Sequence, residues 1–512
     1  MSRRKPASPG PSRRGLIRAI GLGLPAVAAC ASATNPPPPD GFAETGGSGT
    51  TGDSGGGDTA TPGDTVDTGP SVVADTRPAD PTEDWPGKGP ADPSAFPLGM
   101  QLGEPTASSL VVWAYAPGAK EVTVHWASWD GTAWVDGGSA SATPSAEGYV
   151  HHTLEGLQPD EIVAVQAEAG GLTSSVAQGR TAPHPDSLPE VYLGATSCLD
   201  QVHGEFPSLD EVKAIGQLDA MLWLGDTVYA DGNRTLEEYR ALWREQLGKG
   251  SFQRLFARVP GIWTWDDHEV GNNWNPQTID PDHLDVATTT FHETVALPDG
   301  VRSTRKLWRS LRFGRTVELF VLDCRGERDY DAGHYISPEQ LQWLQDGLAA
   351  SECVWKVVAT SVPITDMPQL WDLGGAQEDR WDGFPGTQRA ELLAHIRQQG
   401  LTGVFFVAGD LHQSTVSYVD LPGGDGDDLL EIMAGPGGSV RNTIGRTIKD
   451  DQFVFKEADW SAARLSFHPG GTARLQVAFE EGGPLMLDMT IDDRGNVVRI
   501  DQERHPWLED DT

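Results

Sequence analysis

Residue types that bind metals follow several hydrophobic segments after residue 190 of this 512-residue chain. Cys198 comes after "VYLGAT", Asp226 and Tyr229 lie in "LGDTVYADG", and Asp410 and His412 lie in "AGDLHQS". The segment "WDDHEVGNNW" adds Asp266, Asp267, His268, Asn272 and Asn273. Carboxylate and amide oxygens suit hard cations such as calcium or manganese, whereas a phenolate together with a thiolate suits trivalent iron. A carboxylate shared by two ions would create a two-metal site, which clamps the attacking and leaving oxygens of a displacement.

The segments that carry these residues have the pattern of an α/β domain. From residue 190, apolar stretches such as "AMLWLGD", "GIWTWDDHE" and "GVFFVAGDLH" alternate with helical patterns such as "RTLEEYRALWREQL" and "PEQLQWLQDGLA". Sites in such domains form where the carboxyl ends of strands converge. A single aspartate at a strand end is usually a turn former. Ligand-type residues at nearly every strand end instead indicate a site.

Two different regions precede this domain. Residues 95–182 contain short β-rich runs, including "LVVWAYA" and "EVTVHWASW", separated by Gly and Pro turns, which predicts a small all-β sandwich similar to fibronectin-type domains. Its polar residues show no catalytic clustering, so we favour a packing or spacer role over a separate binding module. Residues 31–94 include the tract "NPPPPDGFAETGGSG", which is too poor in aliphatic residues to offset the entropy of ordering, so we expect a flexible tether.

The first 30 residues resemble an export signal. Arg13 and Arg14 form a twin-arginine pattern before a weakly apolar stretch, and the small residues before Cys30 resemble a lipoprotein cleavage box. A membrane-spanning anchor is disfavoured, because the apolar run is short and Arg18 interrupts it. We therefore expect export by the twin-arginine route to the periplasm or cell surface, with membrane contact only through a lipid on Cys30.

The composition and net charge of the chain limit the kinds of partner that it can bind. The hydrophobic fraction of 38% and the 17 Trp residues suffice for real cores, and the formal net charge is −36. Such an acidic chain has no basic stripe that could displace counterions from nucleic acid, so no nucleic-acid partner is expected. A chain of this charge that handles phosphate must obtain positive charge elsewhere, and metal ions are the obvious source. We expect a monomer.

The motifs together resemble those of the alkaline phosphatase D (PhoD) family of the metallophosphoesterase superfamily. From about Phe96 to at least Val416 they are "FPLGMQLGEPTASSLVVW", "SCLD", "LGDTVY", "WDDHEVGNN", "LDCRGER", "WDGFPGTQRAEL" and "AGDLHQS". The resemblance implies a four-layer α/β core over residues 190–505, with two packed sheets flanked by helices, after the β-sandwich. The segment "LDCRGER" departs from the family's "LDxRxYR" at Cys324 and Glu327, which leaves the completion of the pocket there open.

The resemblance also implies a metal site with one iron and one or two calcium ions. Its expected iron ligands are Cys198, Asp226, Tyr229 and His412, and Asp226 would bridge to calcium. Its expected calcium ligands are Asp267, Asn273 and Asp410, with Asn272 as the alternative to Asn273 and Asp266 as a ligand or an orienting group.

Two more residues receive roles from the same resemblance. His268 is expected to transfer a proton or to orient phosphate, because it follows a ligand position. Arg325 either contacts phosphate or pairs with a carboxylate of the acidic site. His203 and Glu205 follow Cys198 in what we expect to be a surface loop.

Cys198 on its own could be half of a disulfide, a buried small hydrophobe, a nucleophile or a metal ligand. Cys324 is predicted at a strand end and Cys353 at a strand start, so a bridge between them is unfavourable, whereas a bridge to Cys198 stays open in an oxidising compartment. The position of Cys198 among other ligand types favours iron ligation.

The function that these observations predict is an exported, metal-dependent phosphoesterase for phosphate mono- or diesters. One alternative is a phospholipase D-like phosphodiesterase. Another is a catalytically inactive surface-binding protein that uses its β-sandwich.

Overall fold

The computed structural model describes residues 77–367, 379–443, 451–479 and 485–503. The predicted export signal, Cys30 and the tether up to residue 76 lie outside the described residues. Within the described ranges, no helix combines the length and the apolar character that crossing a membrane requires.

The N-terminal strands form a β-sandwich around a core of their own. Leu110 and Val112 on one sheet pack with Val124, Val163 and Val165 on the other, as the alternation of apolar residues predicts. The strands are β1 (Met100–Gly103), β2 (Ser109–Tyr115), β3 (Val122–Trp129), β4 (Trp134–Ala142), β5 (Tyr149–Glu155), β6 (Ile162–Ala169), β7 (Leu172–Thr173) and β8 (Ala177–Arg180).

One sheet of this sandwich continues into the α/β core. Strand β1 pairs in parallel with β11 (Gly261–Thr264), with Gly103 opposite Gly261. A Cβ at Gly103 would collide with the carbonyl oxygen of Ala296, so this junction requires glycine. The sandwich is therefore joined to the core by backbone pairing as well as by sequence.

Residues 77–94 run along the sandwich through polar contacts. Arg180 donates to Asp80 at 2.5 Å, and Arg258 donates to both carboxylate oxygens of Asp84 at 2.6 and 2.5 Å. Ala91 forms a β-bridge with Thr173. The predicted end of the tether near residue 94 therefore lies too late in the sequence.

The α/β core contains two sheets, which are counted here over the described residues. The ten-stranded sheet joins β1, β2 and β5 to β9 (Val191–Thr196), β10 (Ala220–Leu224), β11, β19 (Ser461–His468), β20 (Thr472–Phe479), β21 (Leu487–Asp492) and β22 (Val497–Glu503). The seven-stranded sheet holds β12 (Arg309–Phe313), β13 (Val317–Val321), β14 (Trp355–Ala359), β15 (Val404–Ala408), β16 (Ser414–Tyr418), β17 (Leu430–Met433) and β18 (Phe453–Glu457). Strands β9, β10 and β11 are parallel, and so are β13, β14, β15 and β17.

Alternating side chains divide each sheet between two hydrophobic layers. On β10, Leu222 and Leu224 enter the core between the sheets, while Met221 and Trp223 face the helices. On β14, Val357 belongs to the inter-sheet core, and the next residue belongs to the opposite layer. Apolar residues that point to both faces are typical of strands buried on both sides.

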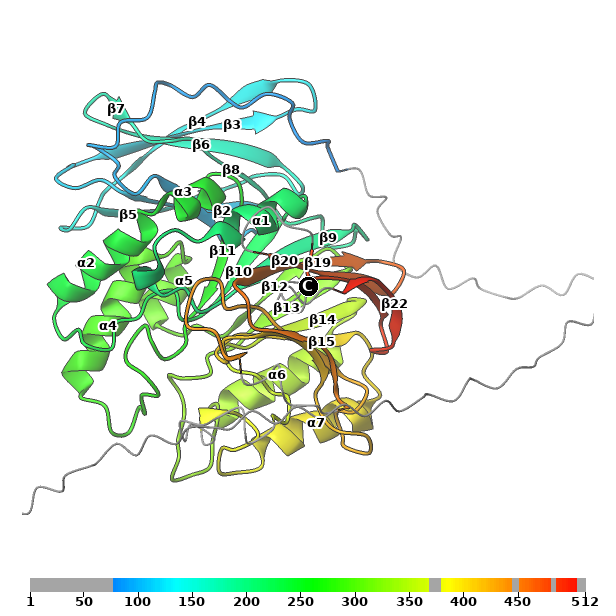
Figure 1. The fold of residues 1–512 in the computed structure, drawn as a ribbon. Coiled ribbons are helices and arrows are strands. Elements are labelled where there is room, and N and C mark those ends of the chain that lie inside the picture. The colour runs from blue at the N-terminus through cyan, green and yellow to red at the C-terminus, as the bar shows by residue number, and fades with distance from the viewer. Residues whose placement is uncertain (1–76, 368–378, 444–450, 480–484, 504–512) are drawn as a thin grey trace, which may run out of the picture. The chain divides into compact units, whose positions relative to one another are not determined.

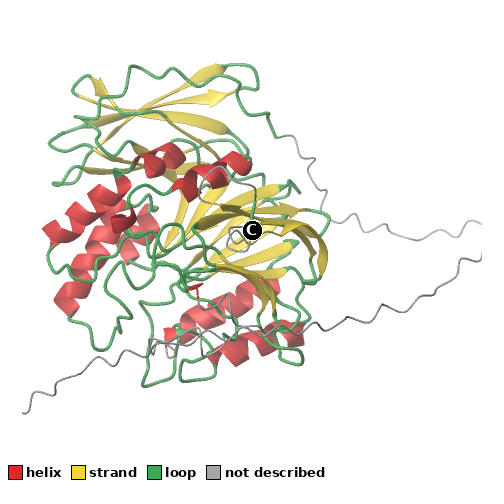
Figure 2. Cartoon of the chain, in the orientation of Figure 1, coloured by secondary structure: helices red, strands yellow, loops and turns green. Residues whose placement is uncertain are grey.

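Helices cover the outer face of each sheet (Figures 1 and 2). The ten-stranded sheet packs against α1 (Pro207–Ile215), α2 (Leu236–Leu247), α3 (Gly250–Phe256), α4 (Pro281–Thr294) and α5 (Asp299–Thr304). The seven-stranded sheet packs against α6 (Pro338–Ala350) and α7 (Gln388–Gln399). A 3₁₀ turn, η1 (Gln201–His203), precedes α1. The predicted four-layer α/β core preceded by a β-sandwich is confirmed.

Local signals set several helix ends. Helices α1, α4 and α6 each begin with proline, at Pro207, Pro281 and Pro338, where the missing N–H has no intrahelical partner to lose. Helix α7 ends at Gly400, which adopts the left-handed conformation with φ 61°. These ends leave the loops at the carboxyl edge of the sheets free to build the site.

Candidate metal centre

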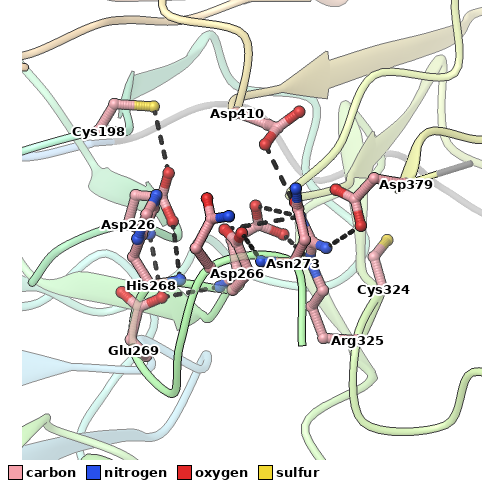
Figure 3. Close-up of polar contacts among 12 residues, drawn as sticks. Cys198, Asp226, Asp266, His268, Glu269, Asn273, Cys324, Arg325, Asp379 and Asp410 are labelled. Carbon is pink, nitrogen blue, oxygen red and sulfur yellow. Dashed lines mark hydrogen bonds and ion pairs between the residues drawn. The ribbon is translucent and has the colours of Figure 1, made fainter. Parts of the chain in front are cut away.

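The predicted ligands converge at the carboxyl ends of β9, β10, β11 and β15 (Figure 3). Cys198 Sγ lies 3.6 Å from Asp226 Oδ2, although the two residues come from different strands. Among the described residues, three groups of possible ligand atoms each fall within 4.8 Å, and Asp226 belongs to all three. One consists of Cys198, Asp226 and His412, another of Asp226, Asp266, Asp267 and Asp410, and the third of Asp226, Asp267 and His268.

Backbone strain is concentrated at these residues. Eight nonglycine residues of the described chain have positive φ, and five of them are predicted ligands. They are Cys198 (58°), Asp226 (53°), Asn273 (50°), Asp410 (74°) and His412 (55°). Such conformations cost about 1–3 kcal/mol each and persist where function requires them. The sharp turns let side chains at strand ends point back over the sheet edge.

Close approach of the loops adds a second constraint. Gly225 has φ 95°, and a Cβ there would lie 2.5 Å from the backbone nitrogen of Asp266. The loops after β10 and β11 can therefore touch only if residue 225 is glycine.

Glu269 fastens the same two loops together. Its buried carboxylate accepts hydrogen bonds from the backbone nitrogens of Asp226 at 3.1 Å, Thr227 at 2.6 Å and Asp266 at 2.9 Å. Burial raises the pKa of Glu269 to about 7. Glu269 stands in the "WDDHE" motif, but its positioning role could be assigned only from these contacts.

Cys198, Tyr229 and His412 form what we call the sulfur side. Tyr229 Oη lies 3.0 Å from His412 Nε2 and accepts a hydrogen bond from Ser439 Oγ at 3.0 Å. Ser197 Oγ lies 3.2 Å from Cys198 Sγ. Burial, with the charge of Asp226, raises the pKa values of the Cys198 thiol and the Tyr229 phenol, and burial lowers that of His412 to about 4. Without a cation this side therefore consists of neutral donors.

Asp266, Asp267, Asn273 and Asp410 form what we call the oxygen side. One terminal atom of the Asn273 amide lies 3.2 Å from Asp267 Oδ2. Asn272 and Asn273 are both exposed, and the backbone nitrogen of Asn272 donates to Asp231 at 2.7 Å. The structure thus brings the Asn273 side chain, rather than that of Asn272, to the cluster.

Arg325 lies inside the oxygen side with no exposed surface. It donates to the two oxygens of Asp266 at 2.7 and 2.8 Å, forms a short hydrogen bond to Asp379, and lies 3.6 Å from Asp267 and 3.7 Å from Asp410. Of the two roles expected for Arg325, the structure shows pairing with carboxylates. The alternative role, a contact with phosphate, stays a prediction.

The pKa values of the carboxyl groups around Arg325 shift in different directions. Burial raises the pKa values of Asp226 and Asp410 well above the usual range and raises that of Asp266. Burial would do the same to Asp267, but the charges of Arg325 and His268 outweigh it and lower its pKa. The cluster is thus short of positive charge despite its internal arginine.

His268 lies at the edge of the cluster. Its ring stacks on Tyr229 with centroids 4.0 Å apart, and its Nδ1 lies 2.8 Å from Asp231 Oδ1. Burial alone would lower the pKa of His268, but the charges of Asp226 and Asp267 and the contact with Asp231 raise it to about 11. A partly exposed imidazole oriented by a carboxylate is suited to proton transfer.

The other residues singled out from the sequence lie outside the cluster. Glu205 is exposed and accepts hydrogen bonds from the first backbone nitrogens of α3, and His203 packs edge-on against Trp460. Cys324 and Cys353 are buried, and these two and Cys198 are free cysteines. The disulfide alternative for Cys198 is therefore wrong for the described part of the chain.

Comparison with known proteins identifies the family. The model of the PhoD-like phosphatase family matches residues 193–469, and the model of its N-terminal domain matches residues 82–183. The chain belongs to the PhoD-like phosphatase family. The family expected from the sequence motifs is confirmed.

One relative resembles this chain in sequence, and two solved structures resemble it in fold. Alkaline phosphatase D from Bacillus subtilis (strain 168) is 26% identical over 387 residues, which span 63% of this chain and 65% of that relative. A solved structure of PhoD shares the fold with TM-score 0.71 and 22% identity, over 80% of this chain and 92% of that one. Purple acid phosphatase PPD1 from yellow lupin seeds has TM-score 0.56 and 13% identity, over 77% of this chain and 74% of that one.

Proposed function

We propose that this protein is a phosphoesterase that hydrolyses phosphate mono- or diesters, with one iron on the sulfur side and calcium on the oxygen side. The observation that carries the proposal is the position of Asp226 between two donor sets of different chemistry. Thiol, phenol and imidazole suit iron, and clustered carboxylate and amide oxygens suit calcium. When bound, the ions supply the positive charge that a phosphoryl group needs and that this acidic chain lacks.

The residues of the chain have distinct tasks in this proposal. Asp226 holds the two sides together, and Glu269 fixes the loop from which it projects. Asp231 orients His268 through Nδ1, which leaves Nε2 as the atom that carries a proton for the leaving oxygen. Arg325 keeps the buried carboxylates of the oxygen side together.

Hydrolysis of p-nitrophenyl phosphate and bis(p-nitrophenyl) phosphate tests the proposal. We expect turnover of at least one ester by the metal-loaded protein and loss of turnover in Asp226→Asn. Preference for the diester would favour the phospholipase D-like alternative. A metal-loaded protein that hydrolyses neither ester would contradict the proposal and favour the inactive binding protein, against which the complete ligand set argues.

We further propose export by the twin-arginine route and lipidation of Cys30. The support is the pattern at Arg13 and Arg14. Replacing both arginines with lysine keeps the charge but should block translocation, because a receptor reads the pair. Normal export of the double-lysine variant, measured by fractionation, would refute the route.

A further inference from the structure

The oxygen side adjoins a carboxylate that was not among the predicted ligands, that of Asp379. The same terminal atom of the Asn273 amide lies 3.2 Å from Asp267 Oδ2 and 3.2 Å from Asp379 Oδ2. An amide has a donor end and an acceptor end of nearly equal shape. If the NH₂ group faces the two carboxylates, it donates to both. If the carbonyl faces them, three oxygens meet, and only a cation between them makes that arrangement favourable.

Asp379 is held so that one of its oxygens faces this point. Its Oδ1 accepts from Arg325 and, at 2.6 Å, from Arg328, and both guanidinium groups are fully buried. Arg328 is itself fixed by hydrogen bonds of 2.5 Å to the Cys324 carbonyl and the Tyr335 hydroxyl. Figure 3 shows Asp379 beside Arg325 and Asn273. The arginines thus anchor one oxygen and leave Oδ2 directed at the cluster.

Asp267 provides an independent sign of a cation site. Its side chain is 2% exposed, and Oδ2 accepts from the backbone nitrogen of Asn273 at 2.5 Å. Its Oδ1 accepts no N–H or hydroxyl hydrogen bond from the described residues, and the nearest guanidinium nitrogen of Arg325 is 3.6 Å away. Apart from these nitrogens, the group that reaches Asp267 is another carboxyl group, that of Asp226. Placing two buried carboxyl groups together is costly, and an ion between them would remove that cost.

We propose that Asp379 is a further ligand of the oxygen-side ion and that the Asn273 amide turns over when the ion binds. In the ion-free site the NH₂ group donates to Asp267 and Asp379. In the loaded site the carbonyl oxygen faces the ion. The inference rests on the proposed function, in which this ion is calcium, and it explains how the empty site stays folded between binding events.

Calcium binding and thermal unfolding of iron-loaded, calcium-stripped protein test the inference. Asp379→Asn should weaken calcium binding by roughly tenfold or more, as measured by titration calorimetry. Asp382→Asn is the matched control, because Asp382 lies in the same loop but pairs with Arg380. Its calcium affinity should equal that of the wild type. Wild-type affinity in Asp379→Asn would overturn the assignment of Asp379.

Asn273→Asp provides a test that does not depend on Asp379. It keeps a ligand oxygen but removes the NH₂ donor, so the calcium-free variant should unfold at a lower temperature than the wild type. Calcium should then raise its unfolding temperature by more than it raises that of the wild type. A destabilisation that calcium does not relieve would show that Asn273 only donates hydrogen bonds, and would overturn the amide rotation. A wild type that binds no calcium would instead refute the calcium assignment of the proposed function, and this inference with it.

Discussion

The sulfur side and the oxygen side share Asp226 but are stabilised in opposite ways. On the oxygen side the buried carboxylates surround Arg325, a cation that belongs to the protein. On the sulfur side the groups that contact Cys198 and Tyr229 include the hydroxyls of Ser197 and Ser439. The difference indicates that the charge of the oxygen side remains partly compensated by Arg325 when its ion leaves, whereas the Cys198 thiol and the Tyr229 phenol must release protons to bind a metal. The two ions should therefore differ in how readily they exchange.

The largest effect should come from the residue common to both sides. Asp226→Asn removes the shared carboxylate charge but keeps the side-chain size. We expect both ions to be lost and turnover to fall by about a thousandfold or more, since metal ions contribute several kcal/mol of charge stabilisation. Rates together with metal content measure the effect. Retention of either ion at the wild-type level would show that the two sides are independent.

A thiol substitution should affect the sulfur side alone. Cys198→Ser replaces an anionic sulfur donor with a neutral hydroxyl, so iron content, the visible charge-transfer band and turnover should all fall. Cys324→Ser is the control, because Cys324 is equally buried but lies 2.9 Å from Thr360 Oγ1, outside the ligand groups. Full iron content in Cys198→Ser would leave the thiol as a buried small hydrophobe.

Chelation should affect the oxygen side alone, and reversibly. EGTA should lower activity by removing calcium while the visible band of iron persists, and added calcium should restore the activity. Activity assays and absorbance on the same sample measure both sides at once. Full activity in calcium-free protein would show that the oxygen side holds another metal or none.

The smallest effect concerns buried titratable groups remote from the cluster. Burial, with the charge of Arg302, lowers the pKa of His151 to about 3, and burial lowers that of His292 to about 4. Below the unfolded value of about 6.5 only the unfolded chain takes up these protons, so the free energy of unfolding should decrease as the pH falls. Each histidine should lower the free energy of unfolding by up to about 2 kcal/mol at pH 5.

Denaturant unfolding of metal-free protein at pH 7 and pH 5 measures this loss. In His151→Gln the difference in the free energy of unfolding between pH 7 and pH 5 should shrink by the amount that His151 contributes. An unchanged difference would mean that His151 is protonated in the folded protein, and that the 3.0 Å contact with the Val295 carbonyl, which favours the protonated ring, outweighs burial.

The sequence predicted the parts of the site that local motifs encode. Cys198, Asp226, Asp267 and Asp410 follow hydrophobic strands directly, and parallel strand ends meet at one edge of a sheet. Asp379 has no such signal, because its role depends on two arginines more than 50 residues away in the chain.

Burial and long-range ion pairs account for the remaining differences. The ion pairs of Arg325 could not be assigned from its motif, since Asp266 and Asp379 lie more than 50 residues away in the chain. Residues 77–94 have the composition of a tether, but Arg180 and Arg258 hold them from distant positions. The composition of a segment indicates how much apolar surface it can bury. It does not indicate which charged residues from distant parts of the chain will contact the segment.

The metal content of the wild-type protein tests the central claim most directly. Elemental analysis of protein purified without chelators should give close to one iron per chain together with calcium. The Cys198→Ser protein should lose the iron and keep the calcium. Wild-type protein that carries neither ion, or a Cys198→Ser variant with both ions at wild-type levels, would contradict the division of the site into a sulfur side and an oxygen side.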